Sequence, residues 1–295
     1  MNTDRSSAGQ VVVGVSSFDA RLPMVRWAAA EAVARRTGLR LVTVCAAPAA
    51  PDLYLPADEA VAHRADAEEV LADMSEYASA AWPGLDVTTE LAEGPTASAL
   101  RAAAESAALL VVGADDASPF VEAISGSVPG DLLTTAPCPL AVVPRREWTT
   151  PASAPVVVAL DEIGTAQSAL AFAFAVAYRT GRALSVLRCV PAGDTDRAED
   201  AEQARTIAAF AELHPDVPVT TVVTAGDPTD VLVTASRTAA LLVLGSRGRG
   251  RLASSLFGSV SRALIRRSGC PVVVARTRPE PLAARRSADP MRRER

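Results

Sequence analysis

Short runs of aliphatic and β-branched residues alternate along the chain with longer, alanine-rich segments. The runs predict strands at residues 11–15, 41–44, 87–91, 109–112, 140–143, 156–160, 184–187, 217–223, 241–244 and 272–275. The segments between them predict helices, among them 22–36, 57–81, one from about 96, two ending at Gly181 and Leu213, and two beginning near Pro228 and Ser259. Strands that are apolar throughout and separated by helices are typical of a parallel sheet covered on both faces, so the pattern predicts an α/β fold. We expect the first helix to stop at Gly38, with Arg35 and Arg36 in its last turn.

The same series of elements occurs twice. The sequence VVVGVSSF at 11–18 corresponds to VVVALDEI at 156–163, and LLVVGADD at 109–116 corresponds to LLVLGSRG at 241–248. A repeat this long indicates duplicated globular domains rather than a solenoid. We therefore expect one domain at 9–147, a second at 154–277, and an Arg-rich, disordered tail at 278–295.

The last strand of each copy, LAVV at 140–143 and VVVA at 272–275, would form a sheet edge if it remained unpaired. Pairing the two copies through these strands covers both edges, so the sequence predicts an internal pseudo-dimer. Whether two chains then form a homodimer stays open.

Composition excludes several kinds of chemistry. All 29 basic residues are arginines, and a chain without lysine cannot form a Walker A loop, a protein-kinase site or a Schiff base. The four cysteines are far apart in sequence and include no CxxC pair, which argues against a structural zinc site, and we expect no metal-binding site. Cys138 and Cys270, each just before a proline, are expected to be packing residues rather than redox sensors.

The net charge of −5 argues against a general nucleic-acid-binding protein. No apolar run approaches the roughly 18 residues that cross a membrane, and the first residues lack the apolar stretch of a signal peptide. We expect a soluble, cytoplasmic protein without membrane contact.

The stretch GSRGRGRLASSLFGS at 245–259 carries the clearest functional pattern. Gly245 follows a predicted strand, Gly248 comes three residues later, and Gly258 and Ser259 open a predicted helix after nine intervening residues. Glycines at a strand end let the backbone approach a phosphate, and a helix N-terminus offers free N–H groups and a positive dipole end. The arginines of this loop, including Arg247 and Arg249, add positive charge.

Other interpretations of the same residues stay open. A run such as GRGRG is often a solvated basic loop, and a Gly-Ser pair is often an ordinary helix N-cap. Asp161, directly after the strand at 156–160, is on its own typical of a turn. The strand–loop–helix order and the spacing favour a nucleotide site.

In these motifs the chain resembles the universal stress protein family, in its tandem, ATP-binding form, over about residues 9–277. The resemblance implies two Rossmann-like domains of the adenine nucleotide alpha hydrolase type, each with five parallel strands and helices on both faces. It implies ATP, with or without Mg²⁺, as the ligand. The residues that it assigns to binding are Asp161, Val190, Gly245, Gly248, Gly258, Ser259, Val260 and Ser261, and the loop arginines Arg247 and Arg249 add charge. Ala159 departs from the family's usual glycine, which the first copy keeps at Gly14.

The two copies differ in the corresponding loop. Residues 113–127 carry three carboxylates, whereas residues 245–259 carry three arginines. Asp116 stands where the second copy has Gly248, and Pro129 stands where it has Ser261. Carboxylates repel phosphates at close range, so we expect one nucleotide per chain, in the second domain, and a degenerate first site.

Three functions are compatible with these observations. The favoured one is a regulatory, stress-response ATP-binding protein, because nothing marks a catalytic base. A slow ATPase is the alternative, with the arginines stabilising charge in the transition state. A nucleic-acid interaction through the arginine loop and tail is the third, and the overall acidity opposes it.

Overall fold

The computed structural model describes residues 9–16, 21–45, 57–114, 128–145, 148–160, 163–190, 197–245 and 256–276. Four of the candidate site residues lie outside these ranges: Asp161, Arg247, Gly248 and Arg249. The acidic loop of the first copy and the Arg-rich tail also lie outside them.

Each repeat alternates strands with helices, as the sequence predicts. The first contains β1 (Val11–Gly14), α1 (Arg21–Arg35), β2 (Leu39–Cys45), α2 (Ala57–Ala81), β3 (Val87–Glu93), α3 (Thr96–Ala103), β4 (Leu109–Gly113), α5 (Val128–Thr135) and β5 (Leu140–Val143). The second contains β6 (Val156–Leu160), α6 (Ile163–Thr180), β7 (Leu184–Val190), α7 (Arg197–Leu213), β8 (Val219–Ala225), α8 (Pro228–Ser236), β9 (Leu241–Gly245), α9 (Leu256–Arg267) and β10 (Val272–Ala275).

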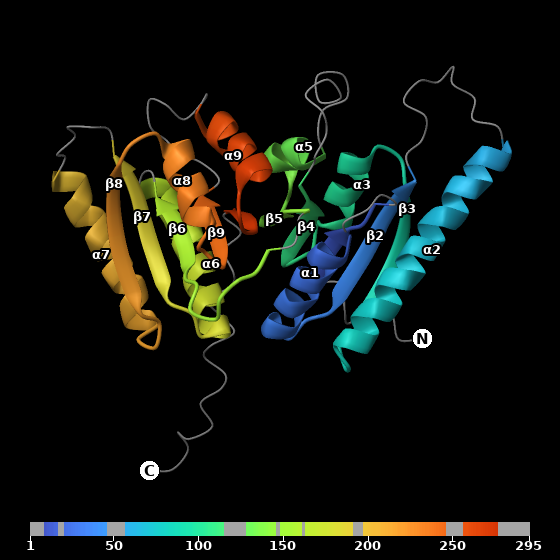
Figure 1. Ribbon diagram of the computed structural model, residues 1–295, viewed down its shortest axis with the longest axis horizontal. Helices are drawn as coiled ribbons and strands as arrows, with labels where there is room; N and C mark the ends of the chain where they lie inside the picture. Colours follow the sequence, from blue (N-terminus) through green and yellow to red (C-terminus); the bar gives the residue numbers. More distant parts are fainter. Residues whose placement is uncertain are drawn as a thin grey trace, which may run out of the picture.

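All strands belong to one 10-stranded sheet with the order β3-β2-β1-β4-β5-β10-β9-β6-β7-β8. Within each repeat every pair of neighbouring strands is parallel. The two halves meet at β5 and β10, which pair antiparallel with Val273 opposite Ala141. The α/β fold with two five-stranded parallel halves is therefore confirmed, and the last strands pair as predicted (Figure 1).

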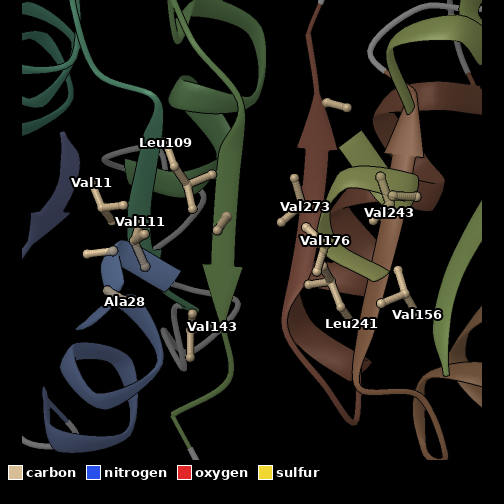
Figure 2. Close-up of a cluster of buried hydrophobic side chains, with 14 of the residues drawn as sticks. Val11, Ala28, Leu109, Val111, Val143, Val156, Val176, Leu241, Val243 and Val273 are labelled. Carbon is tan, nitrogen blue, oxygen red and sulfur yellow. The ribbon is translucent and has the colours of Figure 1, made fainter. Parts of the chain in front are cut away.

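Side chains alternate between the two faces of the sheet and build three cores. On the face covered by α1, α2, α6 and α7, one cluster continues through both repeats, with Val11 and Val143 on one side of the junction and Val156 and Val273 on the other (Figure 2). On the opposite face the clusters are separate, one under α3 and α5 and one under α8 and α9. The continuous core joins the two halves of the sheet, because burying its aliphatic side chains stabilises both repeats together.

Helices α5 and α9 also take part in contacts across the junction. Leu133 of α5 packs against the core of the second repeat, and Ile265 of α9 packs against the core of the first. Arg276, just after β10, donates from Nη1 to the carbonyl of Thr134 at 3.3 Å and from Nη2 to the carbonyls of Leu132 and Leu133. A guanidinium at the last carbonyls of α5 complements the negative end of that helix.

Helix α1 ends earlier than predicted, and Arg36 is not part of its last turn. Arg36 adopts a left-handed conformation with φ of 56°, and the N–H of Thr37 bonds back to the carbonyl of Ala32 at 3.0 Å. The second repeat ends α6 in the same way, with Gly181 at φ of 64° and the N–H of Arg182 bonded to Ala177. The capping position is therefore Arg36, a residue type that pattern reading does not expect at positive φ.

None of the helices in the described part of the chain combines the length and the apolar character needed to cross a membrane.

The matched helix ends predict opposite effects of two substitutions. Arg36→Gly should raise the free energy of unfolding by about 1 kcal/mol, because glycine adopts the left-handed region without the steric cost that an arginine bears. Gly181→Arg should lower it by a similar amount for the same reason. Urea denaturation followed by circular dichroism measures both, and a loss of stability in Arg36→Gly would contradict the assigned cap.

Candidate nucleotide site

The carboxyl ends of the strands of the second repeat meet at one edge of the sheet. Val190 is the last residue of β7 and Gly245 is the last residue of β9. The strand between them, β6, ends at Leu160, directly before Asp161. Because all three strands are parallel, Val190, Gly245 and the chain leading into Asp161 lie along the same edge, where open α/β sheets bind ligands.

Helix α9 begins at Leu256, three residues before the predicted start at Ser259. Gly258 and Ser259 are consequently the third and fourth residues of the helix and do not cap it. The N–H groups of the N-cap and of the first three residues of an α-helix have no partner within the helix, so Gly258 still presents a backbone donor. The earlier start of α9 is compatible with the sequence, because glycine and serine are tolerated in the first turn of a helix. There packing and charge matter more than helix propensity.

Two further candidate residues follow in α9. Val260 packs against the core of the second repeat, which fixes the rotation of the helix over the sheet. Ser261 is 3% exposed, and among the described residues its Oγ has no hydrogen-bond partner. Helical hydroxyls usually bond to a carbonyl one turn earlier, as Ser236 does to Val233 at 2.7 Å. The Ser261 hydroxyl is therefore a buried donor without an acceptor, a group that a bound anion would satisfy.

Ala159, which replaces the glycine of the first repeat, is accommodated by packing. A Cβ on Gly14 would lie 2.8 Å from Cδ1 of Leu100, so an alanine there would require the side chain of that leucine to shift. Ala159 packs against the cluster that contains Leu232 of α8 and is part of the core wall.

Sequence reading missed Arg188. Its side chain is 8% exposed, two residues before Val190 on β7, and its register partner on β6 is Leu160. The predicted strand stopped at 187 because a charged residue ends an apolar run, whereas the observed strand continues to Val190. At the same register the first repeat has Thr43, since β2 begins at Leu39 as β7 begins at Leu184. The sequence signal that could have revealed Arg188 is the presence of a charged residue inside the run LSVLRCV.

Cys138 and Cys270 occupy equivalent positions and both are fully buried. Burial raises the pKa of the Cys270 thiol to about 12, even though a hydrogen bond with Ser268 acts in the opposite direction. Since the thiolate is the reactive form, this environment favours a packing role for Cys270.

This pKa predicts the labelling of the folded protein. At pH 8 the Cys270 thiol stays protonated, and its thiolate becomes abundant only as the pH approaches about 12. Iodoacetamide should therefore modify the half-buried Cys45 and Cys189 at least about tenfold faster than Cys270, as measured by peptide mass spectrometry. All four cysteines should react once the chain is unfolded in guanidinium, and equal rates in the folded state would refute the assignment.

Comparison with known proteins agrees with the duplicated fold. The sequence profile of the universal stress protein family matches residues 8–144 and 154–276. Universal stress protein Rv2623 of Mycobacterium tuberculosis (strain ATCC 25618 / H37Rv) is 32% identical, with 94% of this chain and 99% of the relative covered.

A solved structure shows the same architecture. A universal stress protein from Archaeoglobus fulgidus DSM 4304 matches with a TM-score of 0.74 and 21% identity, covering 92% of this chain and 97% of that chain. A universal stress protein in complex with cAMP is 26% identical and covers 47% of this chain and 99% of that chain, with a TM-score of 0.37. From the two profile matches and the relatives that span nearly its full length, the chain belongs to the universal stress protein family.

Proposed function

We propose that this protein is a regulatory, stress-response ATP-binding protein that holds one nucleotide per chain, in its second repeat. The observation that carries the proposal is the position of Gly245 at the end of β9, combined with Gly258 and Ser259 in the first turn of α9. A glycine at a strand end and free N–H groups at a helix start are the two parts of a phosphate site that needs no lysine.

Side chains at the same edge supply further donors and charge. The Ser261 hydroxyl, which has no hydrogen-bond partner among the described residues, can donate to a phosphate oxygen, and Arg188 lies buried two residues before the end of β7. The adenine end would lie against Val190, the position that the family resemblance assigns to it. Mg²⁺, if it accompanies the nucleotide, would be held by the phosphates rather than by a dedicated protein cage.

The proposal places the nucleotide in only one repeat because of charge. The loop that contains Gly248 carries three arginines, and its counterpart carries three carboxylates. Two described positions also differ between the repeats. Arg188 corresponds to the neutral Thr43, and Ser261 corresponds to Pro129, which has no N–H to offer. Each difference favours an anion in the second repeat.

A regulatory role follows from what binding can change. Helix α9 packs against the core of the first repeat through Ile265, so a shift of α9 on nucleotide binding would reach the first repeat. Slow ATP hydrolysis is the competing function. Phosphate release measured in a single turnover separates the two, because a committed ATPase must release phosphate faster than nucleotide dissociates.

Nucleotide content tests the stoichiometry. Protein is purified without added nucleotide, saturated with ATP and then denatured. It should release close to one adenine nucleotide per chain, measured by chromatography and mass spectrometry. Two per chain would contradict the asymmetry of the repeats, and none would contradict the proposal itself.

Substitution of Gly248 tests the location. Gly248→Asp should reduce ATP binding to near zero with the fold retained, because it adds both a Cβ and a carboxylate facing phosphate. Ala117→Asp is the matched control, since it adds the same charge to the corresponding loop of the first repeat. Calorimetry should find unchanged affinity in the control. Equal loss in both variants would indicate a general charge effect and would count against the second repeat as the site.

Ser261 provides a finer test. Ser261→Ala should weaken ATP binding by about tenfold, the value of one hydrogen bond to a charged acceptor. Stability should not fall, because in the described part of the chain the Oγ has no partner to lose. Unchanged affinity would remove Ser261 from the site.

A further inference from the structure

A cleft separates the two repeats at the edge of the sheet opposite to the nucleotide site. It has a volume of about 340 Å³, and its walls come from α1, from α6 and from Trp148 and Thr150 of the linker, the segment between β5 and β6. Val156 and Leu241, the first residues of β6 and β9, form its floor. Strand starts and strand ends lie at opposite edges of a parallel sheet, so this cleft is distinct from the edge that carries Gly245.

The walls of the cleft are largely apolar. Trp27 of α1 and Trp148 of the linker both line it, and both pack against the core that continues through the two repeats. Small side chains, Ala30 and Ala34 of α1, leave the space between the aromatic groups and α6 open. Indole faces and small aliphatic side chains are the surroundings in which planar ring systems bind.

The charged groups at the cleft are mostly arginines. Glu31 is 7% exposed and is already compensated, because Nε of Arg35 lies 3.2 Å and Nη2 of Arg179 lies 4.0 Å from its Oε2. Arg26 lies exposed at the rim. Arg182 also lines the cleft, and its Nη1 donates to the carbonyls of Pro151, Ala152 and Ala154 at 2.8 to 3.0 Å.

The sum of these groups is positive. Among the described residues two arginines line the cleft, Arg26 and Arg182, and the one carboxylate that lines it, Glu31, is already compensated by Arg35 and Arg179. The carbonyls that orient Arg182 are neutral and leave its charge in place. Arg182 is only partly exposed, so its charge attracts an anion more strongly than that of a fully exposed residue, since screening by solvent is weaker there.

We propose that this cleft binds a small planar aromatic anion, with the ring against Trp27 and Trp148 and the acidic group directed to Arg26 and Arg182. The volume is at the lower end of the range of small-molecule sites and suits one or two fused rings with a single acidic group. Because the walls belong to both repeats, the ligand would contact both halves and the linker between them.

The three tryptophans of the chain allow a direct test by ¹⁹F NMR of protein labelled with 5-fluorotryptophan. Naphthalene-2-sulfonate is the probe, and naphthalene-2-sulfonamide is its uncharged counterpart. Single Trp→Phe variants assign the signals. The sulfonate should shift the signals of Trp27 and Trp148 in a saturable way, and the signal of Trp82, which packs against Tyr77 with 6.1 Å between ring centroids, should not move.

Charge dependence is the second part of the test. The sulfonamide should bind at least about tenfold more weakly, and Arg26→Gln should weaken binding of the sulfonate about tenfold. Arg101→Gln, which removes an equally exposed arginine from α3, is the matched control and should leave binding unchanged. Gly248→Asp should also bind the probe normally, so that failure of the nucleotide site and failure of this cleft are told apart.

Several results would overturn the proposal. No saturable shift of Trp27 or Trp148 up to millimolar probe would exclude the site, and an equal shift of Trp82 would show general association with the surface. Equal affinity for sulfonate and sulfonamide, or an unchanged affinity in Arg26→Gln, would exclude recognition of the anion.

Discussion

The antiparallel pairing of β5 with β10 is the constraint on which the rest of the structure depends. Each of these strands is the last of its repeat, and every residue of both is buried. Left unpaired, each would expose a row of backbone N–H and C=O groups beside fully apolar side chains. Their pairing places Val272 opposite Val142 and Val274 opposite Leu140, which aligns the two faces of the sheet so that one core continues across the junction.

This junction brings together α5 and α9, the corresponding helices of the two repeats. Leu133 of α5 and Ile265 of α9 each pack into the core of the other repeat, and Arg276 binds the last carbonyls of α5. A change at the start of α9 therefore acts on a helix that is held by both halves. The cleft beside Trp27 and Trp148 lies at the edge of the sheet where β6 and β9 begin, opposite to the edge that carries Gly245. The two edges therefore offer chemically different surfaces.

Most of the fold could be predicted from the sequence because most strands contain a short apolar run and several are bounded by Pro or Gly. The segments 140–143 and 272–275 have the predicted bounds for this reason. The errors occur where tertiary contacts override local preference. Arg36 takes a backbone conformation that local pattern assigns to glycine, and Arg188 continues a strand that its charge should have ended.

The candidate site was predictable only in part. The position of Gly245 follows from the end of an apolar run, but the burial of Ser261 depends on how α9 rotates over the sheet, and local sequence does not determine that rotation. Asp161, Arg247 and Gly248 lie outside the described residues, so their role remains the one that spacing predicts.

The linker turns what would be an encounter between two molecules into a contact within one. In a dimer of identical subunits every substitution appears twice, and both copies of a helix end or a loop must change together. Here the same helix end carries arginine at 36 and glycine at 181, and neither choice constrains the other. Covalent duplication thus lets each half vary under its own selection. Because the linker joins the two halves, their association does not depend on the protein concentration.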